Sequence, residues 1–215
     1  MKEYLNHYNV IYISLNELPR KCESYDQYIS RIENRLIQDL IEAYPDCRIG
    51  EEDAVWDVLL EIFSTTGKEK FIFVLDEWDF IFHRDFVTEK DKKEYISFLS
   101  NLLKDKPYVS LAYMTGILPI AKYSSGSELN MFIEFSMAAQ QRFSDYFGFT
   151  ETEVCELYHR YLERTAETAV DLDGLKEWYD GYHTASGERV YNPRSVVAAL
   201  SNNQLASYWT SSGQS

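Results

Sequence analysis

Three acidic side chains stand directly after an apolar run in the sequence FIFVLDEWDF, which spans Phe71–Phe80. The acids are Asp76, Glu77 and Asp79, and the five residues before Asp76 are all hydrophobic, as in a buried strand. A buried strand is expected to end in a turn, and a turn that carries three carboxylates is unusual. The acids either begin a solvated loop or are placed at the end of a buried strand to bind or react.

Asp-Glu after a hydrophobic strand is the Walker B pattern of the P-loop ATPases. The strand holds the first acid where it can bind Mg²⁺, usually through water, because Mg²⁺ prefers oxygen ligands and keeps part of its hydration shell. The second acid can polarise the water that attacks a γ-phosphate. The pattern predicts that Asp76 is the metal acid and that Glu77 is the catalytic acid. Thr115 ends another apolar run, at the place of a γ-phosphate sensor, although Thr115-Gly116 can also be a plain turn.

The elements that must position these residues are three apolar runs, Val10–Leu15, Phe71–Leu75 and Tyr108–Met114. Segments of helical periodicity separate them, and none of the three alternates polar and apolar residues. This pattern predicts an α/β fold with a parallel sheet covered on both faces. Ligands of such sheets bind beyond the carboxyl ends of the strands, so Asp76 and Thr115 are expected at one edge.

The rest of the chain is predicted to be mainly helical. Beyond about Gly148 helical patterns predominate, so residues 1–148 are predicted to form the α/β core and residues 149–215 a helical, lid-like subdomain. A hairpin is expected around Ser186-Gly187. The expected helix starts and helical faces are Ser24 with Gln27, Val55–Phe63, Tyr95–Leu103, Thr150 with Glu153, and Asn192 before Pro193.

Composition excludes several classes of function. The 215 residues carry a formal net charge of −14, and no Lys/Arg run exceeds two residues, so a nucleic-acid surface is not expected. A signal peptide and a membrane helix are not expected, because no long apolar run is present, and the three scattered cysteines suit a reducing cytoplasm. The histidines and cysteines show no metal-ligand spacing.

Taken together, several blocks resemble the bacterial AAA-ATPase-like family of P-loop proteins. In order they read FIFVLDEWD, AYMTGILPIAK, RFSDYFGFTETEV, LKEWYDGYH and VYNPRSVVAAL. The resemblance runs from about Val10 to Trp209 and implies a P-loop NTPase-like parallel sheet flanked by helices, with ATP and Mg²⁺ as ligands. It implies that Asp76 is the magnesium acid, Glu77 the catalytic acid and Thr115 the sensor residue. Asp79 matches a further acid of the family, and the family's helical signature falls on Tyr179–Tyr182.

The chain departs from the family at the phosphate-binding loop. No G-x-x-x-x-G-K-[ST] segment is present, and the Gly67-Lys68 pair is followed by Glu. The resemblance therefore implies a core that is incomplete at its N-terminal strand, with nucleotide binding and hydrolysis impaired in this chain. The sheet is expected to keep an exposed apolar edge, covered by the tail, by a partner chain or by self-association.

Other functions remain open on the sequence alone. The chain can be a nonenzymatic interaction module or a remnant of a larger ATPase. A carboxylate hydrolase with Glu77 as acid or nucleophile is a further alternative. Arg84 and Arg142 are either surface charges or phosphate contacts, Arg142 in the manner of an arginine finger.

Overall fold

A computed structural model describes residues 7–50, 52–123, 128–135, 142–143, 146–184 and 187–208. The chain divides into two compact units, Met1–Ile133 and Glu134–Ser215, a boundary upstream of the one expected after residue 148. Each unit is described by itself.

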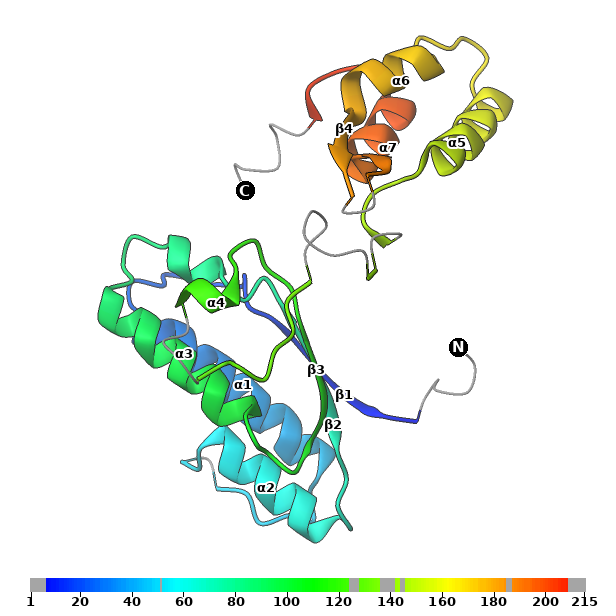
Figure 1. The fold of residues 1–215 in the computed structure, drawn as a ribbon. Coiled ribbons are helices and arrows are strands. Elements are labelled where there is room, and N and C mark those ends of the chain that lie inside the picture. The colour runs from blue at the N-terminus through cyan, green and yellow to red at the C-terminus, as the bar shows by residue number, and fades with distance from the viewer. Residues whose placement is uncertain are drawn as a thin grey trace. The chain divides into compact units, whose positions relative to one another are not determined.

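The first unit is built on a parallel sheet of three strands, β1 (Asn9–Ser14), β2 (Phe71–Asp76) and β3 (Val109–Met114). The strand order is β1-β2-β3, so β2 lies in the middle (Figure 1). The three strands correspond to the three apolar runs of the sequence, and the prediction of a parallel sheet is confirmed. Among the described residues β3 pairs with β2 alone, which leaves β3 at an edge of the sheet.

Three amphipathic helices cover one face of this sheet: α1 (Tyr25–Ala43), α2 (Val55–Thr65) and α3 (Glu89–Leu103) (Figure 1). Their apolar stripes and the inward side chains of the strands form one hydrophobic core. Alternate residues of β2 point into it, and Phe73 and Leu75 are fully buried. Two short helices, η2 (Phe80–His83) and α4 (Ile120–Tyr123), follow β2 and β3.

The opposite face of the sheet differs from the sequence prediction. Val10, Tyr12, Leu111 and Tyr113 point to this face and are 56–61% exposed. The prediction of a sheet covered on both faces is therefore wrong for the described part of the unit. The apolar runs arise because both faces of the sheet carry apolar side chains, but the described helices of this unit pack against only one face (Figure 1).

The second unit combines helices with a pair of antiparallel strands on either side of the predicted hairpin turn, of which Ser186 lies outside the described residues. Its helices are α5 (Glu151–Arg164), α6 (Leu172–Tyr179) and α7 (Pro193–Asn202), and its antiparallel strands are β4 (Asp180–His183) and β5 (Arg189–Tyr191). These elements enclose a separate small core.

The predicted helix starts are confirmed in both units. Thr150 and Glu153 form the full capping box of α5, and Asn192 caps α7 with Pro193 at its first position. In the first unit, the Ser24 side chain accepts a hydrogen bond from the backbone N–H of Gln27 at the start of α1. Side-chain caps satisfy N–H groups that lack an intrahelical partner, which is why these local signals can be read from sequence.

Two buried tyrosines attach the helices to the carboxyl ends of the strands. The hydroxyl of Tyr28 in α1 donates to the carbonyl oxygen of Leu15 at 2.7 Å, just beyond β1. The hydroxyl of Tyr95 in α3 donates to the carbonyl oxygen of Trp78 at 2.8 Å, just beyond β2. Both side chains are fully buried, so these bonds hold the segments that follow the strands against the helical layer.

We predict that Tyr95→Phe lowers the free energy of unfolding by about 1–2 kcal/mol, because it leaves the buried Trp78 carbonyl without its donor. Urea denaturation followed by circular dichroism measures this change. Tyr113→Phe is the matched control, since Tyr113 is largely exposed and its substitution should change stability by less than about 0.5 kcal/mol. Equal effects of the two substitutions would contradict a stabilising hydrogen bond from Tyr95 to the Trp78 carbonyl.

The same tyrosines predict a loss of stability in alkali. Burial raises the pKa of Tyr28 and of Tyr95 above the usual tyrosine value. The folded state therefore binds these protons more tightly than the unfolded state does. The two protonated tyrosines therefore make their full contribution to the free energy of unfolding below about pH 10, and this contribution is lost as the pH rises further. Urea titrations from pH 8 to pH 11 test this, and ionisation of both phenols near pH 10 in an intact fold would refute it.

Candidate functional site

The carboxylate of Asp76 and the hydroxyl of Thr115 meet where β2 and β3 end. Asp76 is the last residue of β2 and Thr115 directly follows β3, and the Thr115 hydroxyl donates to Asp76 Oδ1. The other carboxylate oxygen, Oδ2, accepts a hydrogen bond from the Tyr12 hydroxyl at 3.2 Å. The predicted meeting of Asp76 with Thr115 at one edge of the sheet is thus observed, and Tyr12 is an additional member of the cluster.

Glu77 is held next to this cluster by its backbone. Its N–H donates to the Thr115 hydroxyl oxygen at 3.1 Å, so Thr115 bridges Asp76 and Glu77. The φ angle of Glu77 is +54°, in the left-handed region that non-glycine residues adopt rarely and that is associated with functional sites. The Glu77 side chain is exposed at this edge.

Asp79 organises the loop that follows β3. Its Oδ2 atom accepts hydrogen bonds from the backbone N–H groups of Ile117 at 3.0 Å and Leu118 at 2.7 Å. The side chain is almost completely buried, and the imidazole of His83 lies 3.9 Å from the same oxygen. This geometry gives Asp79 a positioning role: its carboxylate fixes the loop that begins at Thr115.

Gly116 allows that loop to pass close to Trp78 and Asp79. A Cβ atom at Gly116 would lie 2.5 Å from the indole nitrogen of Trp78 and 2.7 Å from Asp79 Oδ1. Trp78 is itself buried and stacks edge-on against Phe82. The Thr115-Gly116 pair therefore does more than turn the chain, since Thr115 supplies a hydroxyl to the cluster and Gly116 provides the space.

The two predicted arginine candidates both contact aromatic rings. Arg84 has its guanidinium carbon 3.9 Å from the centre of the Phe80 ring. Arg142 belongs to the second unit, where its guanidinium lies over the rings of Phe135 and Phe143. The Asp76 cluster is built entirely from residues of the first unit.

The residues present fit one part of a magnesium-nucleotide site. Across the described residues no group of three or more His, Cys, Asp and Glu side chains is arranged to hold a metal ion. Mg²⁺ in nucleotide sites needs fewer than three protein side chains, because one or two carboxylates, waters and substrate phosphates supply its ligands. Asp76, fixed by Tyr12 and Thr115, fits that demand. The sequence has no Gly-rich phosphate loop, so the nucleotide part of the site does not fit this chain by itself.

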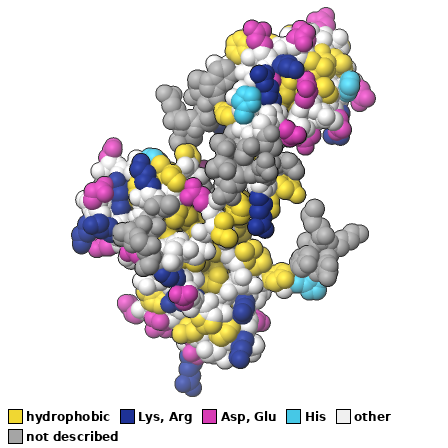
Figure 2. Space-filling model, viewed as in Figure 1, with side chains coloured by type: hydrophobic (Ala, Val, Ile, Leu, Met, Phe, Trp, Pro, Cys, Tyr) yellow, Lys and Arg dark blue, Asp and Glu magenta, His cyan; other side chains and the backbone are white. Residues whose placement is uncertain are grey.

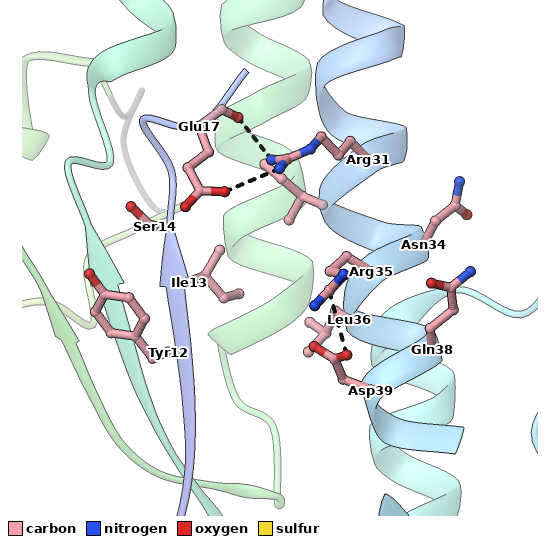
Figure 3. A pocket seen from close by; sticks show the side chains of 11 residues that line it. Tyr12, Ile13, Ser14, Glu17, Arg31, Asn34, Arg35, Leu36, Gln38 and Asp39 are labelled. Carbon is pink, nitrogen blue, oxygen red and sulfur yellow. Dashed lines mark hydrogen bonds and ion pairs between the residues drawn. The ribbon is translucent and has the colours of Figure 1, made fainter. Parts of the chain in front are cut away.

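A cavity of about 590 Å³ lies between β1 and α1 (Figure 3). Both arginines that line it form salt bridges. Arg31 Nη2 lies 3.1 Å from Glu17 Oε2, and Arg35 Nε lies 3.5 Å from Asp39 Oδ1. Both guanidinium groups are thus already paired, and the cavity has no unpaired positive group for a phosphate among these residues. Tyr12 lines this cavity and also bonds Asp76.

In the second unit, the Tyr179–Tyr182 signature forms the junction of α6 and β4. The Tyr179 hydroxyl donates to the carbonyl oxygen of Ala206 at 2.8 Å, and Asp180 pairs with Arg189 at 3.3 Å across the hairpin. These contacts support a structural role for the signature.

Sequence reasoning missed two contributors to the candidate site. Tyr12 carried no motif, and its link to Asp76 follows from the parallel register in which Tyr12 pairs with Val74, two residues before Asp76. The helical pattern predicts only that Tyr95 is a core residue of its helix, whereas its hydroxyl also fixes the segment between Asp76 and Asp79.

Comparison with known proteins gives one distant relative. The "uncharacterized protein in vnfD 5'region" of Azotobacter chroococcum mcd 1 is 28% identical over 171 residues, which cover 78% of this chain and 32% of the relative. The chain therefore spans about a third of the length of that relative. No family model and no solved structure matches the chain. None of the helices described is both long enough and apolar enough to cross a membrane.

We predict that Gly116→Ala lowers the free energy of unfolding by about 1–3 kcal/mol, because the added methyl group has to displace the buried Trp78 side chain. Thermal and urea denaturation measure the change. Gly181→Ala is the matched control: nothing lies within 4 Å of a Cβ at Gly181, so this change should be nearly neutral. Comparable losses for both variants would show that the close approach of Gly116 to Trp78 is wrong.

Proposed function

We propose that the first unit is the Walker B and sensor portion of an AAA-ATPase-like P-loop domain. In this proposal Asp76 binds Mg²⁺ through water, Glu77 polarises the attacking water and Thr115 reports on the γ-phosphate. The observation that carries the proposal is the Thr115 bridge between Asp76 Oδ1 and the Glu77 N–H across two adjacent parallel strands. Strand ends at which polar groups converge are the usual ligand positions of parallel α/β sheets.

The arrangement of the strands supports the proposal further. An acid that follows a buried middle strand is fixed by its strand, and the neighbouring strand delivers a hydroxyl to it. The left-handed backbone at Glu77 turns the chain immediately after Asp76 and leaves the Glu77 carboxylate exposed at the edge. Asp79 and Gly116 keep the loop after Thr115 in place.

The proposed activity requires a phosphate-binding segment that this sequence lacks. Backbone N–H groups of a Gly-rich loop and its Lys bind the phosphates in P-loop proteins. Nucleotide binding and hydrolysis are therefore proposed for the domain once such a segment is supplied, with ATP and Mg²⁺ as its ligands. Among the described strands β3 pairs with β2 alone, and the added strand is proposed to pair with β3 at this edge.

A second candidate function is a nonenzymatic interaction module. The exposed apolar side chains of Val10, Tyr12, Leu111 and Tyr113 favour it, because they make up much of one sheet face. A contiguous exposed apolar patch is characteristic of a binding surface.

We predict that a fusion that places a strand, a G-x-x-x-x-G-K-[ST] loop and a helix ahead of Tyr8 binds Mg-ATP, whereas the chain alone does not. Glu77→Gln in this fusion should keep ATP binding and abolish phosphate release, since only the water-polarising group is removed. Equilibrium dialysis with labelled ATP measures binding, and release of inorganic phosphate measures turnover.

The matched control for Glu77→Gln is Glu89→Gln, which removes an exposed carboxylate that pairs with Lys92 in α3. The control fusion should keep both binding and turnover. A folded fusion that binds no ATP, or one whose Glu77→Gln form releases phosphate at the unmodified rate, would contradict the ATPase proposal.

A further inference from the structure

We propose that the sheet face which the described helices of the first unit leave uncovered binds one amphipathic α-helix of another polypeptide, with the helix N-terminus beside Asp76. We call this surface the open sheet face. Its side chains form two rows across the strands: Val10, Ile72, Leu111 and Tyr12, Val74, Tyr113. This inference deepens the interaction-module candidate and does not depend on nucleotide binding.

The rows follow directly from the register of the strands. Val10 pairs with Ile72, which pairs with Leu111, and the next row on the same face is two residues further along each strand. The two side chains of the middle strand are partly buried by their neighbours, and the four on the outer strands are more than half exposed. Figure 2 shows hydrophobic side chains gathered over the strands of the first unit. Six adjacent apolar side chains thus form one continuous surface.

The dimensions of this surface suit a single helix. Six residues of a strand span about 20 Å, and the outer strands of a three-stranded sheet lie about 10 Å apart. A helix of 12–14 residues is about 18–21 Å long and about 10 Å across. One helix can therefore cover both rows with an apolar stripe of ordinary width.

Charges at the two ends of the strands favour one direction for that helix. Asp76 lies on the open sheet face at the carboxyl end of β2, and the exposed Glu77 follows it. Exposed Lys70 and partly buried Lys106 precede β2 and β3 at the opposite end. A helix carries partial positive charge at its N-terminus and partial negative charge at its C-terminus. A helix antiparallel to the strands therefore places its N-terminus beside the acids and its C-terminus beside the lysines.

A second copy of this chain fits the face less well. The platform measures about 20 Å by 15 Å, or roughly 300 Å², whereas a standard stable interface buries about 800 Å² on each partner. Stacking two copies would also bring together chains of formal net charge −14. A neutral or basic amphipathic helix avoids the charge repulsion, and its contact area matches that of the platform.

The proposal is tested with the full chain and a fluorescein-labelled, 14-residue amphipathic peptide with Leu and Ala on one face and Gln and Ser on the other. Fluorescence anisotropy should show saturable binding in the micromolar range. A scrambled peptide of the same composition should not bind. Leu111→Thr combined with Tyr113→Thr should weaken binding at least tenfold, because it removes half of the exposed outer-strand side chains.

The matched control combines Leu162→Thr with Val197→Thr, which changes exposed apolar side chains of the second unit and should leave binding unchanged. Asp76→Asn with Glu77→Gln should weaken binding about two- to fivefold, the range expected for a helix-dipole interaction. Circular dichroism establishes that each variant is folded, and Leu111→Lys alone replaces the double variant if that one unfolds.

Three results would overturn the proposal. The first is the absence of saturable peptide binding to the unmodified chain. This result would also be obtained if another part of the chain covered the open sheet face. The second is an equal loss of binding in the second-unit control. The third is a stable dimer in light scattering that Leu111→Thr with Tyr113→Thr dissociates, since a second copy would then occupy the face.

Discussion

The hydroxyl of Thr115 is the contact on which the candidate site depends. It donates to Asp76 and accepts from the backbone of Glu77, so one side chain from the end of β3 fixes both acids at the end of β2. The contact is possible because the strands are parallel and adjacent, which brings their carboxyl ends to one edge. The Tyr95 hydrogen bond to Trp78 and the Asp79 hydrogen bonds to the following loop then hold both segments in place.

The same sheet has two chemically similar faces with different environments. Alternate side chains of β2 enter the core beneath the helices, while the intervening ones, ending with Asp76, belong to the open sheet face. The apolar surface and the acidic edge are therefore parts of one face. This continuity links the two proposed functions, because an element that covers the apolar rows also reaches Asp76.

Much of this architecture could be predicted from sequence. The apolar runs identified all three parallel strands, and the caps at Ser24, Thr150 and Asn192 identified helix starts, because these signals are local. The meeting of Asp76 and Thr115 followed from the rule for parallel strand ends. The uncovered face could not be predicted, since an apolar run reveals that both faces are apolar but not which elements cover them. The burial of Asp79 and the Tyr12 contact depend on tertiary register, which no local pattern encodes.

A double-mutant cycle between Asp76 and Thr115 tests the central contact most directly. Urea unfolding of Asp76→Ala, Thr115→Val and the double variant gives their coupling free energy. A hydrogen bond to a carboxylate at this position predicts a coupling of about 1–3 kcal/mol. Effects that add to within about 0.3 kcal/mol would show that the two side chains do not interact, and the proposed site would lose its basis.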